Sequence, residues 1–210
     1  MTLAGLYVLI DPAACRGRDP VAVARAALAG GAAVLQWRDK LRDKGEQLAE
    51  ARAIYELCRE RDAAFIVNDH ADLALALDGP PARGAIGVHI GQKDLPLTAL
   101  RAIVPAFFLA GVSTNNREEA VAAQTNGASY IAVGDLFGTA TKEGTRTASP
   151  ARLSEVRDGV SLPVFGIGGI TLANAGEVMA AGAAGVAVIS AVCAADDPEQ
   201  AARALVAAIT

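Results

Sequence analysis

Eight short apolar runs alternate with alanine-rich segments along this chain, and this alternation limits the folds that it can adopt. The runs are rich in Val, Ile, Leu and Phe and lie at 6–11, 33–39, 64–69, 85–91, 107–113, 130–137, 163–169 and 185–190. The segments between them favour helices, for example at 21–29, 46–61, 117–126, 173–181 and 198–209. Mostly apolar strands are typical of a parallel sheet that is covered on both faces. We therefore predict a succession of βα units.

The length of the chain favours a single barrel. Its 210 residues fit one domain, and no linker or shift in composition marks a boundary, so we predict one domain over 1–210. Eight βα units in this length predict a (β/α)8 TIM barrel, an α/β fold. An open doubly wound sheet is the alternative. That fold favours a glycine-rich loop after the first strand, where this chain has DPAA at 11–14.

Composition argues against several classes of function. A net charge of −4 and an aromatic content of 4% disfavour a nucleic-acid groove, which needs a basic stripe with stacking rings. The cysteines at 15, 58 and 193 form no CxxC pair, which favours a reducing compartment. The first residues lack a basic region, so we expect no signal peptide and a cytoplasmic protein. The uncharged stretch 178–195 contains Gly182 and Gly185, and we interpret it as helix, turn and strand rather than a membrane span.

Polar residues that end the apolar strands are the candidates for chemistry, because a TIM barrel carries its active site at the carboxyl ends of its strands. The second strand ends in QWRDK at 36–40. Side chains alternate across a strand, so Gln36, Arg38 and Lys40 share one face while Trp37 can pack against the helices. Arg and Lys both suit phosphate groups. The alternative is a solvated strand end whose cations pair with Asp39 or Asp43.

Two aspartates follow neighbouring strands. Asp69 ends the third run and Asp94 follows the fourth. Adjacent strands lie about 4.8 Å apart, so one divalent ion can bridge the two side chains. Mg²⁺ favours one or two carboxylates together with water and substrate phosphate. The alternative is that each aspartate caps a helix, one near His70 and the other after Pro96.

Glycines and hydroxyls follow other strands. Gly169 follows the seventh strand and Ser190 the eighth, where this fold often binds phosphate, although the glycines also suit a tight turn. The polar loop 138–147 contains Lys142, and we interpret it as a lid that grips phosphate. Ser113 is a small donor at the same mouth. We interpret His89 as a core residue or a support for another side chain, and the cysteines as core hydrophobes.

These features predict two anion-binding zones and one metal pair. One zone consists of the second strand with the lid lysine, and the other of the turns after the seventh and eighth strands with the lid threonines. Such a mouth suits transfer between two phosphorylated small molecules, one of which carries a metal-bound diphosphate.

The motifs together resemble those of the thiamine phosphate synthase (thiamine-phosphate pyrophosphorylase) family. In the order of that family they are QWRDK at 36–40, ND at 68–69, HIGQKD at 89–94, GVS at 111–113, TATK at 139–142, GGI at 168–170 and IS at 189–190. The resemblance implies a transferase that joins 4-amino-2-methyl-5-(diphosphooxymethyl)pyrimidine to 4-methyl-5-(2-phosphooxyethyl)thiazole or its carboxylated form. The products are thiamine phosphate and pyrophosphate. The resemblance further implies that diphosphate leaves first and that the thiazole nitrogen captures the pyrimidine carbocation.

The resemblance also implies roles for individual residues. It implies that Asp69 and Asp94 bind Mg²⁺. The residues that offset charge on the leaving diphosphate are Arg38, Lys40, Ser113 and Lys142. The pyrimidine diphosphate contacts are Gln36, Trp37, Arg38, Asp39, Lys40, Asn68, Ser113 and Lys142. The thiazole phosphate contacts are Thr139, Ala140, Thr141, Gly169, Ile189 and Ser190.

Two departures and three rival functions accompany this resemblance. Asn115 stands where family members often have His, and the segment 78–83 looks longer than usual. A thiazole tautomerase of the same fold would need that His, and a non-catalytic carrier of thiamine phosphates would not need both aspartates. A sugar-phosphate isomerase would need a Glu or His base at a strand end. The expected partners are phosphorylated small molecules, without nucleic acid or membrane, and the oligomeric state, a homo-oligomer included, stays open.

Overall fold

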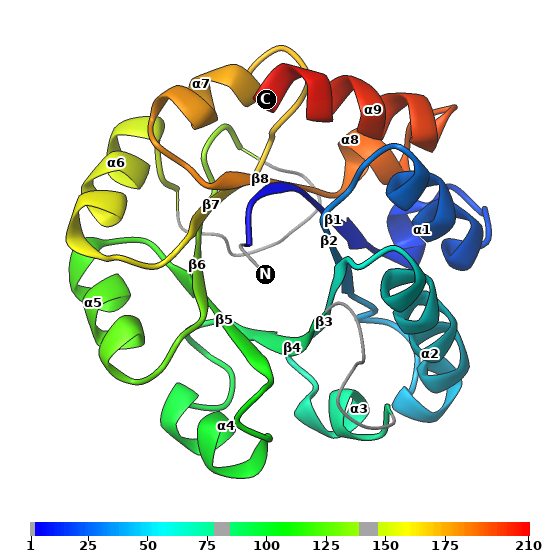
Figure 1. Cartoon of the computed structure of the whole chain (residues 1–210), viewed down its shortest axis with the longest axis horizontal. Helices are drawn as coiled ribbons and strands as arrows, with labels where there is room; N and C mark the ends of the chain where they lie inside the picture. The colour runs from blue at the N-terminus through cyan, green and yellow to red at the C-terminus, as the bar shows by residue number, and fades with distance from the viewer. Residues whose placement is uncertain (1–2, 78–84, 139–146) are drawn as a thin grey trace.

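Eight parallel strands close into a barrel in the computed structural model, in the simple order β1 to β8. The structure describes residues 3–77, 85–138 and 147–210. Helices surround the strands, and the last helix packs beside the first (Figure 1). This arrangement confirms the predicted TIM barrel and excludes the open doubly wound sheet. No helix within the described ranges is long and apolar enough to cross a membrane.

The elements follow the predicted alternation. The strands are β1 (Gly5–Ile10), β2 (Val34–Trp37), β3 (Ala64–Asn68), β4 (Ala85–Ile90), β5 (Leu109–Thr114), β6 (Tyr130–Val133), β7 (Val164–Ile167) and β8 (Gly185–Val188). The helices are η1 (Pro12–Ala14), α1 (Pro20–Ala29), α2 (Lys44–Glu60), α3 (Ala71–Leu75), α4 (Leu97–Ile103), α5 (Arg117–Thr125), α6 (Pro150–Gly159), α7 (Ala175–Ala180), α8 (Ser190–Cys193) and α9 (Pro198–Ile209).

Side-chain alternation divides the core into two parts. One part fills the barrel and consists of Leu3, Tyr7, Leu9, Val34, Ala64, Ile66, Tyr130, Phe165, Ala187 and Ile189. The other part lies between the strands and the surrounding helices. Inside the barrel the rings of Tyr7, Tyr130 and Phe165 contact one another edge to face, with centroids 5.5–6.0 Å apart. These positions obey the period of two that places alternate residues of a strand on opposite faces.

Glycine at one position allows the barrel to close. Gly185 on β8 pairs with Gly5 on β1. A Cβ atom at Gly185 would lie 2.0 Å from the carbonyl oxygen of Gly5. Because backbone atoms cannot move aside as a flexible side chain can, only a residue without a Cβ fits this contact.

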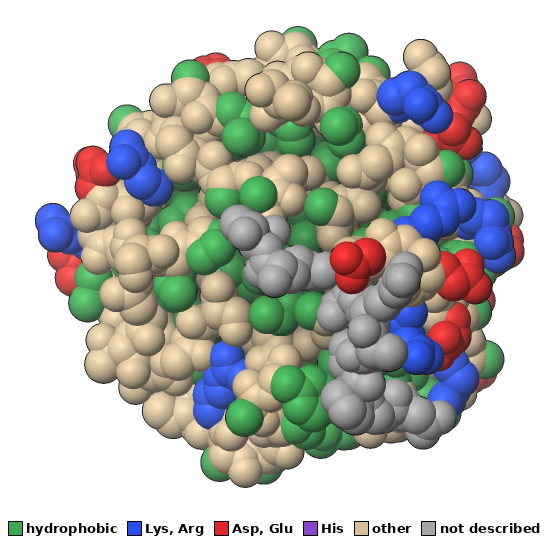
Figure 2. Space-filling model, viewed as in Figure 1, with side chains coloured by type: hydrophobic (Ala, Val, Ile, Leu, Met, Phe, Trp, Pro, Cys, Tyr) green, Lys and Arg blue, Asp and Glu red, His purple; other side chains and the backbone are tan. Residues whose placement is uncertain are grey.

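Charged residues lie mainly outside the barrel. On the face in Figure 2 most of them lie towards the rim, where groups of opposite sign are neighbours. Exposed ion pairs of this kind include Arg16 with Asp196 and Arg203 with Glu199. The three cysteines are buried and unoxidised, in line with the interpretation of them as core residues.

Candidate active site

Charged side chains meet where the strands end, at the mouth of the barrel. The guanidinium of Arg38, after β2, pairs with the carboxylate of Asp11, after β1. Their side chains are only 11% and 7% exposed. Asp11 also caps η1, because its carboxylate accepts a hydrogen bond from the N–H of Ala13 at 3.0 Å. Arg38 therefore does not form the ion pairs with the aspartates at 39 and 43 that we considered from sequence.

A second cation and a carboxylate meet beside this pair. Lys40 Nζ lies 2.5 Å from Asp69 Oδ2, and the side chains are 51% and 15% exposed. The N–H of Asp69 donates to the carbonyl of His89 on the neighbouring strand at 2.8 Å. The carboxylate makes no capping bond to α3, which begins after His70. Asp69 is thus fixed at the mouth by β4 and Lys40 rather than by a helix.

Asp94 belongs to the loop after β4. Its carboxylate accepts a hydrogen bond from the N–H of Gly91 at 2.7 Å, and α4 begins without a side-chain cap. The backbone N–H of Asp69 is bonded to His89, and the N–H of Gly91 to Asp94. His89 and Gly91 are two residues apart, which corresponds to about 7 Å of extended chain. Both residues are therefore bonded to the end of β4, Asp69 through its backbone and Asp94 through its carboxylate, and neither has the capping role that we considered as an alternative.

These two carboxylates fit a hard divalent cation. The described residues contain no group of three or more His, Cys, Asp or Glu side chains that could hold a metal. Mg²⁺ does not require such a group, since it is commonly bound by one or two carboxylates, with water and substrate phosphate in the remaining positions. Asp69 and Asp94 carry carboxylate oxygens of this kind.

Two predicted substrate contacts point away from the mouth. Trp37 is buried among the helices and its Nε1 donates to Gln47 Oε1 at 3.0 Å. Asp39 accepts from the N–H of Leu41 at 2.9 Å and from Arg42 Nε at 2.5 Å. Burial raises the pKa of Asp39, but these hydrogen bonds outweigh it and the net pKa is lowered. Both side chains build the turn after β2, because they alternate with the residues that face inward.

A row of polar side chains forms the floor of the mouth. Gln36, Tyr7, Tyr130, His89 and Ser113 are linked one to the next by hydrogen bonds. A cavity of about 10 Å³ lies against this row, and it is lined by Tyr7, Leu9, Gln36, His89, Ser113, Ala132, Ile167 and Ala187. His89 thus supports another side chain, as the sequence suggested. Tyr7 and Tyr130 are not among the predicted residues, since their only signal in the sequence is a hydroxyl within an otherwise aliphatic strand.

The turns after β7 and β8 lie on the same rim, since these strands are neighbours. Gly169 has a φ of +63°, and a Cβ there would lie 2.3 Å from the carbonyl oxygen of Gly138. Asn174 stabilises this turn, since its Nδ2 donates a hydrogen bond to the Gly169 carbonyl at 3.0 Å. Ser190 begins α8 with an exposed side chain, whereas Ile189 is buried.

Other predicted residues divide between the mouth and the part of the chain that is not described. Asn68 is buried at the end of β3, on the inward face. The predicted lid residues lie outside the described ranges; they are Thr139, Ala140, Thr141 and Lys142. The segment 78–83 also lies outside these ranges. Asn115 is a bridge between loops, because its Nδ2 donates to the carbonyls of Gly134 at 3.1 Å and Thr147 at 3.3 Å.

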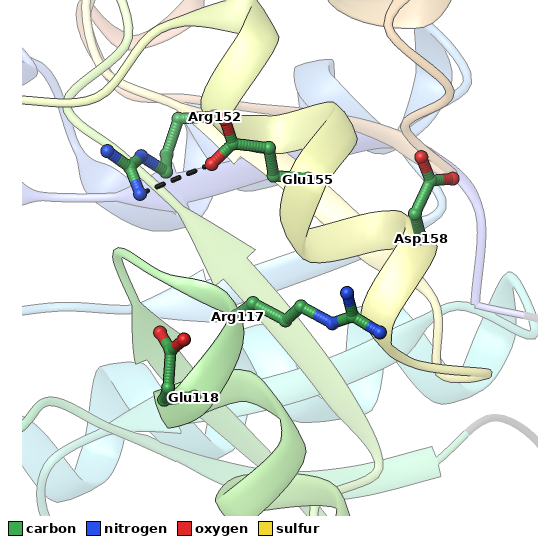
Figure 3. Close-up of a pocket in the computed structure, with 5 residues that line it drawn as sticks. All are labelled: Arg117, Glu118, Arg152, Glu155 and Asp158. Atoms are coloured by element: carbon green, nitrogen blue, oxygen red, sulfur yellow. Dashed lines mark ion pairs between the residues drawn. The ribbon is translucent and has the colours of Figure 1, made fainter.

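A larger cavity, of about 350 Å³, lies away from the strand ends. It lies on the outer surface between α5 and α6 (Figure 3), and its lining residues are Arg117, Glu118, Arg152, Glu155 and Asp158. Arg152 pairs with Glu155 at 3.2 Å, and Arg157 pairs with Asp158. These side chains are about half exposed, so they form a solvated surface hollow. The barrel mouth, with buried and converging polar groups, is the better candidate for chemistry.

Comparison with known proteins agrees with this geometry. The model of the thiamine monophosphate synthase family matches residues 6–192. The chain is 44% identical over 200 residues to a thiamine-phosphate synthase of Methanospirillum hungatei, covering 95% of this chain and 94% of that one. It is 47% identical over 204 residues to a thiamine-phosphate synthase of Methanoculleus marisnigri, covering 95% and 92%.

A solved structure is similar over the same length. The thiamine phosphate pyrophosphorylase from Pyrococcus furiosus superposes with a TM-score of 0.87 at 35% identity, covering 98% of this chain and 95% of that one. The match therefore extends across the whole barrel, including every strand end described above. The chain belongs to the thiamine monophosphate synthase family.

Proposed function

We propose that this protein is a transferase that joins the aminopyrimidine diphosphate to the thiazole phosphate, releasing pyrophosphate and forming thiamine phosphate. The observation that carries this proposal is that Arg38, Lys40, Asp69 and Ser113 all lie at or just after the carboxyl ends of β2, β3 and β5, at the mouth of one barrel, in a chain that belongs to this family. The names of the relatives support the same activity.

The cations beside β2 serve the departing diphosphate. The bond between the pyrimidine methylene carbon and the diphosphate oxygen breaks, and negative charge grows on that oxygen. Arg38 offers a planar fork of donors and Lys40 a mobile ammonium group, which suit phosphate oxygens. Because Asp11 holds Arg38 in place before substrate binds, little reorganisation is needed when the charge develops.

Asp69 and Asp94 are the residues that would hold Mg²⁺. When bound there, Mg²⁺ supplies positive charge that neutralises the diphosphate as it leaves. Lys40, which contacts Asp69 in the structure, is half exposed and can turn towards the diphosphate. Asn68 precedes Asp69 on the inward face and can donate to the same oxygens.

The polar floor itself, rather than the cavity of about 10 Å³ beside it, which holds no more than one water, would face the pyrimidine ring. Gln36 Oε1 is buried and has no hydrogen-bond partner among the described residues. An unsatisfied buried acceptor is costly, and the amino group of the pyrimidine would satisfy it. The remaining walls are apolar, with Leu9, Ile167 and Ala187 among them. Such walls exclude water, so the thiazole nitrogen meets less competition for the pyrimidine carbocation.

The turns after β7 and β8 suit the second substrate. Gly169 has the positive φ that this turn requires, and the exposed Ser190 hydroxyl after the neighbouring strand is a donor for phosphate. The thiazole phosphate would then lie across the mouth from the diphosphate. The rival activities fit less well, because both Asp69 and Asp94 are present at the mouth and Asn115 replaces the His that a tautomerase needs.

One assay tests the activity directly. The protein is mixed with the pyrimidine diphosphate, either form of the thiazole phosphate and Mg²⁺, and thiamine phosphate and pyrophosphate are measured. Equimolar formation of both products is expected. Failure to form thiamine phosphate with either thiazole would refute the proposal.

Two variants test the placement of the substrates. Arg38→Ala should raise the KM of the pyrimidine diphosphate about tenfold or more and that of the thiazole much less, since a hydrogen bond to a charged group is lost. Ser190→Ala should do the reverse. Arg152→Ala, in the outer cavity, is the matched control and should change neither KM. Equal effects of Arg38→Ala on both KM values would contradict its placement.

A further inference from the structure

Five polar side chains inside the barrel form one continuous row of hydrogen bonds. Gln36 Nε2 lies 2.5 Å from the Tyr7 hydroxyl, which lies 2.9 Å from the Tyr130 hydroxyl. His89 Nδ1 lies 3.0 Å from the Tyr130 hydroxyl, and His89 Nε2 lies 2.9 Å from Ser113 Oγ. The first four side chains are buried, and Ser113 stands where the row reaches the mouth.

Counting protons gives this row a direction. Gln36 Nε2 can only donate, so the Tyr7 oxygen accepts from it and the single Tyr7 proton goes to Tyr130. Tyr130 then has its own proton for His89 Nδ1. A histidine that accepts at Nδ1 carries its proton on Nε2, and this proton goes to Ser113 Oγ. In this direction every buried hydroxyl proton along the row has a partner, as buried polar groups require.

Burial keeps the two tyrosines in the protonated state that this order needs. It is the main cause of a raised pKa for Tyr7 and for Tyr130. Both hydroxyls therefore remain donors at all ordinary pH values.

The sequence leaves room for the central contact of the row. Gly111 on β5 stands between His89 on β4 and Tyr130 on β6 in the strand register. A Cβ at Gly111 would lie 2.1 Å from Tyr130 Cζ and 2.5 Å from His89 Nδ1. A larger residue there would push the tyrosine and the imidazole apart. The hydrogen bond between them thus depends on glycine at this position.

We propose that Tyr7 and Tyr130 are positioning residues, which hold His89 as the Nε2–H tautomer so that the Ser113 hydroxyl points its proton into the mouth. This inference rests on the proposed function, with Ser113 in the contact with the diphosphate that the family resemblance implies. With the opposite tautomer, Ser113 would donate to His89 and turn its lone pairs towards an anion. The row therefore makes Ser113 a donor to the substrate rather than an acceptor.

Nitrogen-15 NMR of the histidine rings tests the tautomer without any substrate. The chain has two histidines, so His70→Asn leaves His89 as the single signal. In this background His89 should be the Nε2–H tautomer, and Tyr130→Phe should abolish that preference. Tyr7→Phe is the second variant, should Tyr130→Phe fail to fold. An Nδ1–H tautomer in the parent, or an unchanged preference in the Phe variants, overturns the inference.

Kinetics test whether the row acts through Ser113. Tyr130→Phe should lower kcat about tenfold, the effect of one misdirected hydrogen bond to a charged group, while the KM of the thiazole stays within about twofold. In a Ser113→Ala background the same change should have no further effect. Tyr55→Phe is the matched control, because the buried Tyr55 hydroxyl has no partner among the described residues. An equal loss in both backgrounds would show a merely structural role.

The two readouts separate the possible failures. If the unaltered protein forms no thiamine phosphate, the proposed function fails, while the NMR result still decides the direction of the row. If the protein is active and the losses from Tyr130→Phe and Ser113→Ala add, the inference fails and the proposed function stands.

Discussion

The buried ion pair between Asp11 and Arg38 gives a sharp prediction for Asp11→Asn. The variant keeps an oxygen that can accept from the N–H of Ala13, so the start of η1 is preserved. It removes the negative charge beside Arg38, whose side chain is only 11% exposed. The expected loss is therefore that of an uncompensated cation and not that of a broken helix cap.

The structure sets the size of this loss. Breaking a buried ion pair from one side costs about 3–5 kcal/mol. Arg38 retains some access to water, so we expect about 2–3 kcal/mol. For a protein of this length that corresponds to a fall in Tm of roughly 5–10 °C. Inorganic pyrophosphate should restore part of it, because its oxygens can replace the missing carboxylate.

Thermal unfolding with and without pyrophosphate and Mg²⁺ measures both effects. Asp196→Asn is the matched control, since Asp196 pairs with Arg16 on the surface and its side chain is 99% exposed. That variant should show no measurable change in Tm. The reasoning is refuted if Asp11→Asn melts like the control, or if pyrophosphate raises the Tm of variant and parent by the same amount.

Three further predictions concern the metal, the closure of the barrel and pH. Asp94→Ala should reduce turnover by at least tenfold and raise the Mg²⁺ concentration needed for half-maximal rate; unchanged activity without added metal would contradict the assignment. Gly185→Ala should lower Tm by roughly 5 °C or more, because its Cβ would meet the backbone of Gly5, whereas Gly45→Ala, in open space, should not lower it. The lowered pKa of Asp39 means that its stabilisation is complete above about pH 4 and is lost as pH falls through the folded-state pKa. The stability difference between the parent and Asp39→Asn, measured by denaturant unfolding, should therefore shrink from about pH 5 to about pH 2, and a constant difference would contradict this.

Strand positions were predictable because burial on both faces leaves a local signature, and the ends of the strands were less so. The sixth apolar run extends to 137, yet β6 ends at Val133. The residues that follow still bond to the neighbouring chain, since the N–H of Leu136 donates to Ile167 and that of Phe137 to Gly168. Apolar residues therefore continue beyond the regular hydrogen-bond ladder of β6, and composition cannot show at which residue that ladder ends.

The candidate site was predictable where its residues extend a strand. Alternation alone placed Arg38 on the inward face and Trp37 on the helix side, and the structure agrees. It could not show that Arg38 would pair with Asp11, because the partners are 27 positions apart and meet only through the pairing of β1 with β2. The sequence likewise gave no reason to connect Tyr7 with Tyr130, which are 123 positions apart.

By itself the sequence determined the order of strands and helices, the closed parallel sheet and the alternation that turns Arg38 inward and Trp37 towards the helices, since each of these depends on local periodicity and chain length. The tertiary structure alone decided which of those polar groups contact one another, because closure of the barrel brings together strands that are distant in the chain. The row of hydrogen bonds inside the barrel depends on those contacts. It forms only because the folded barrel brings its five side chains together: Gln36, Tyr7, Tyr130, His89 and Ser113.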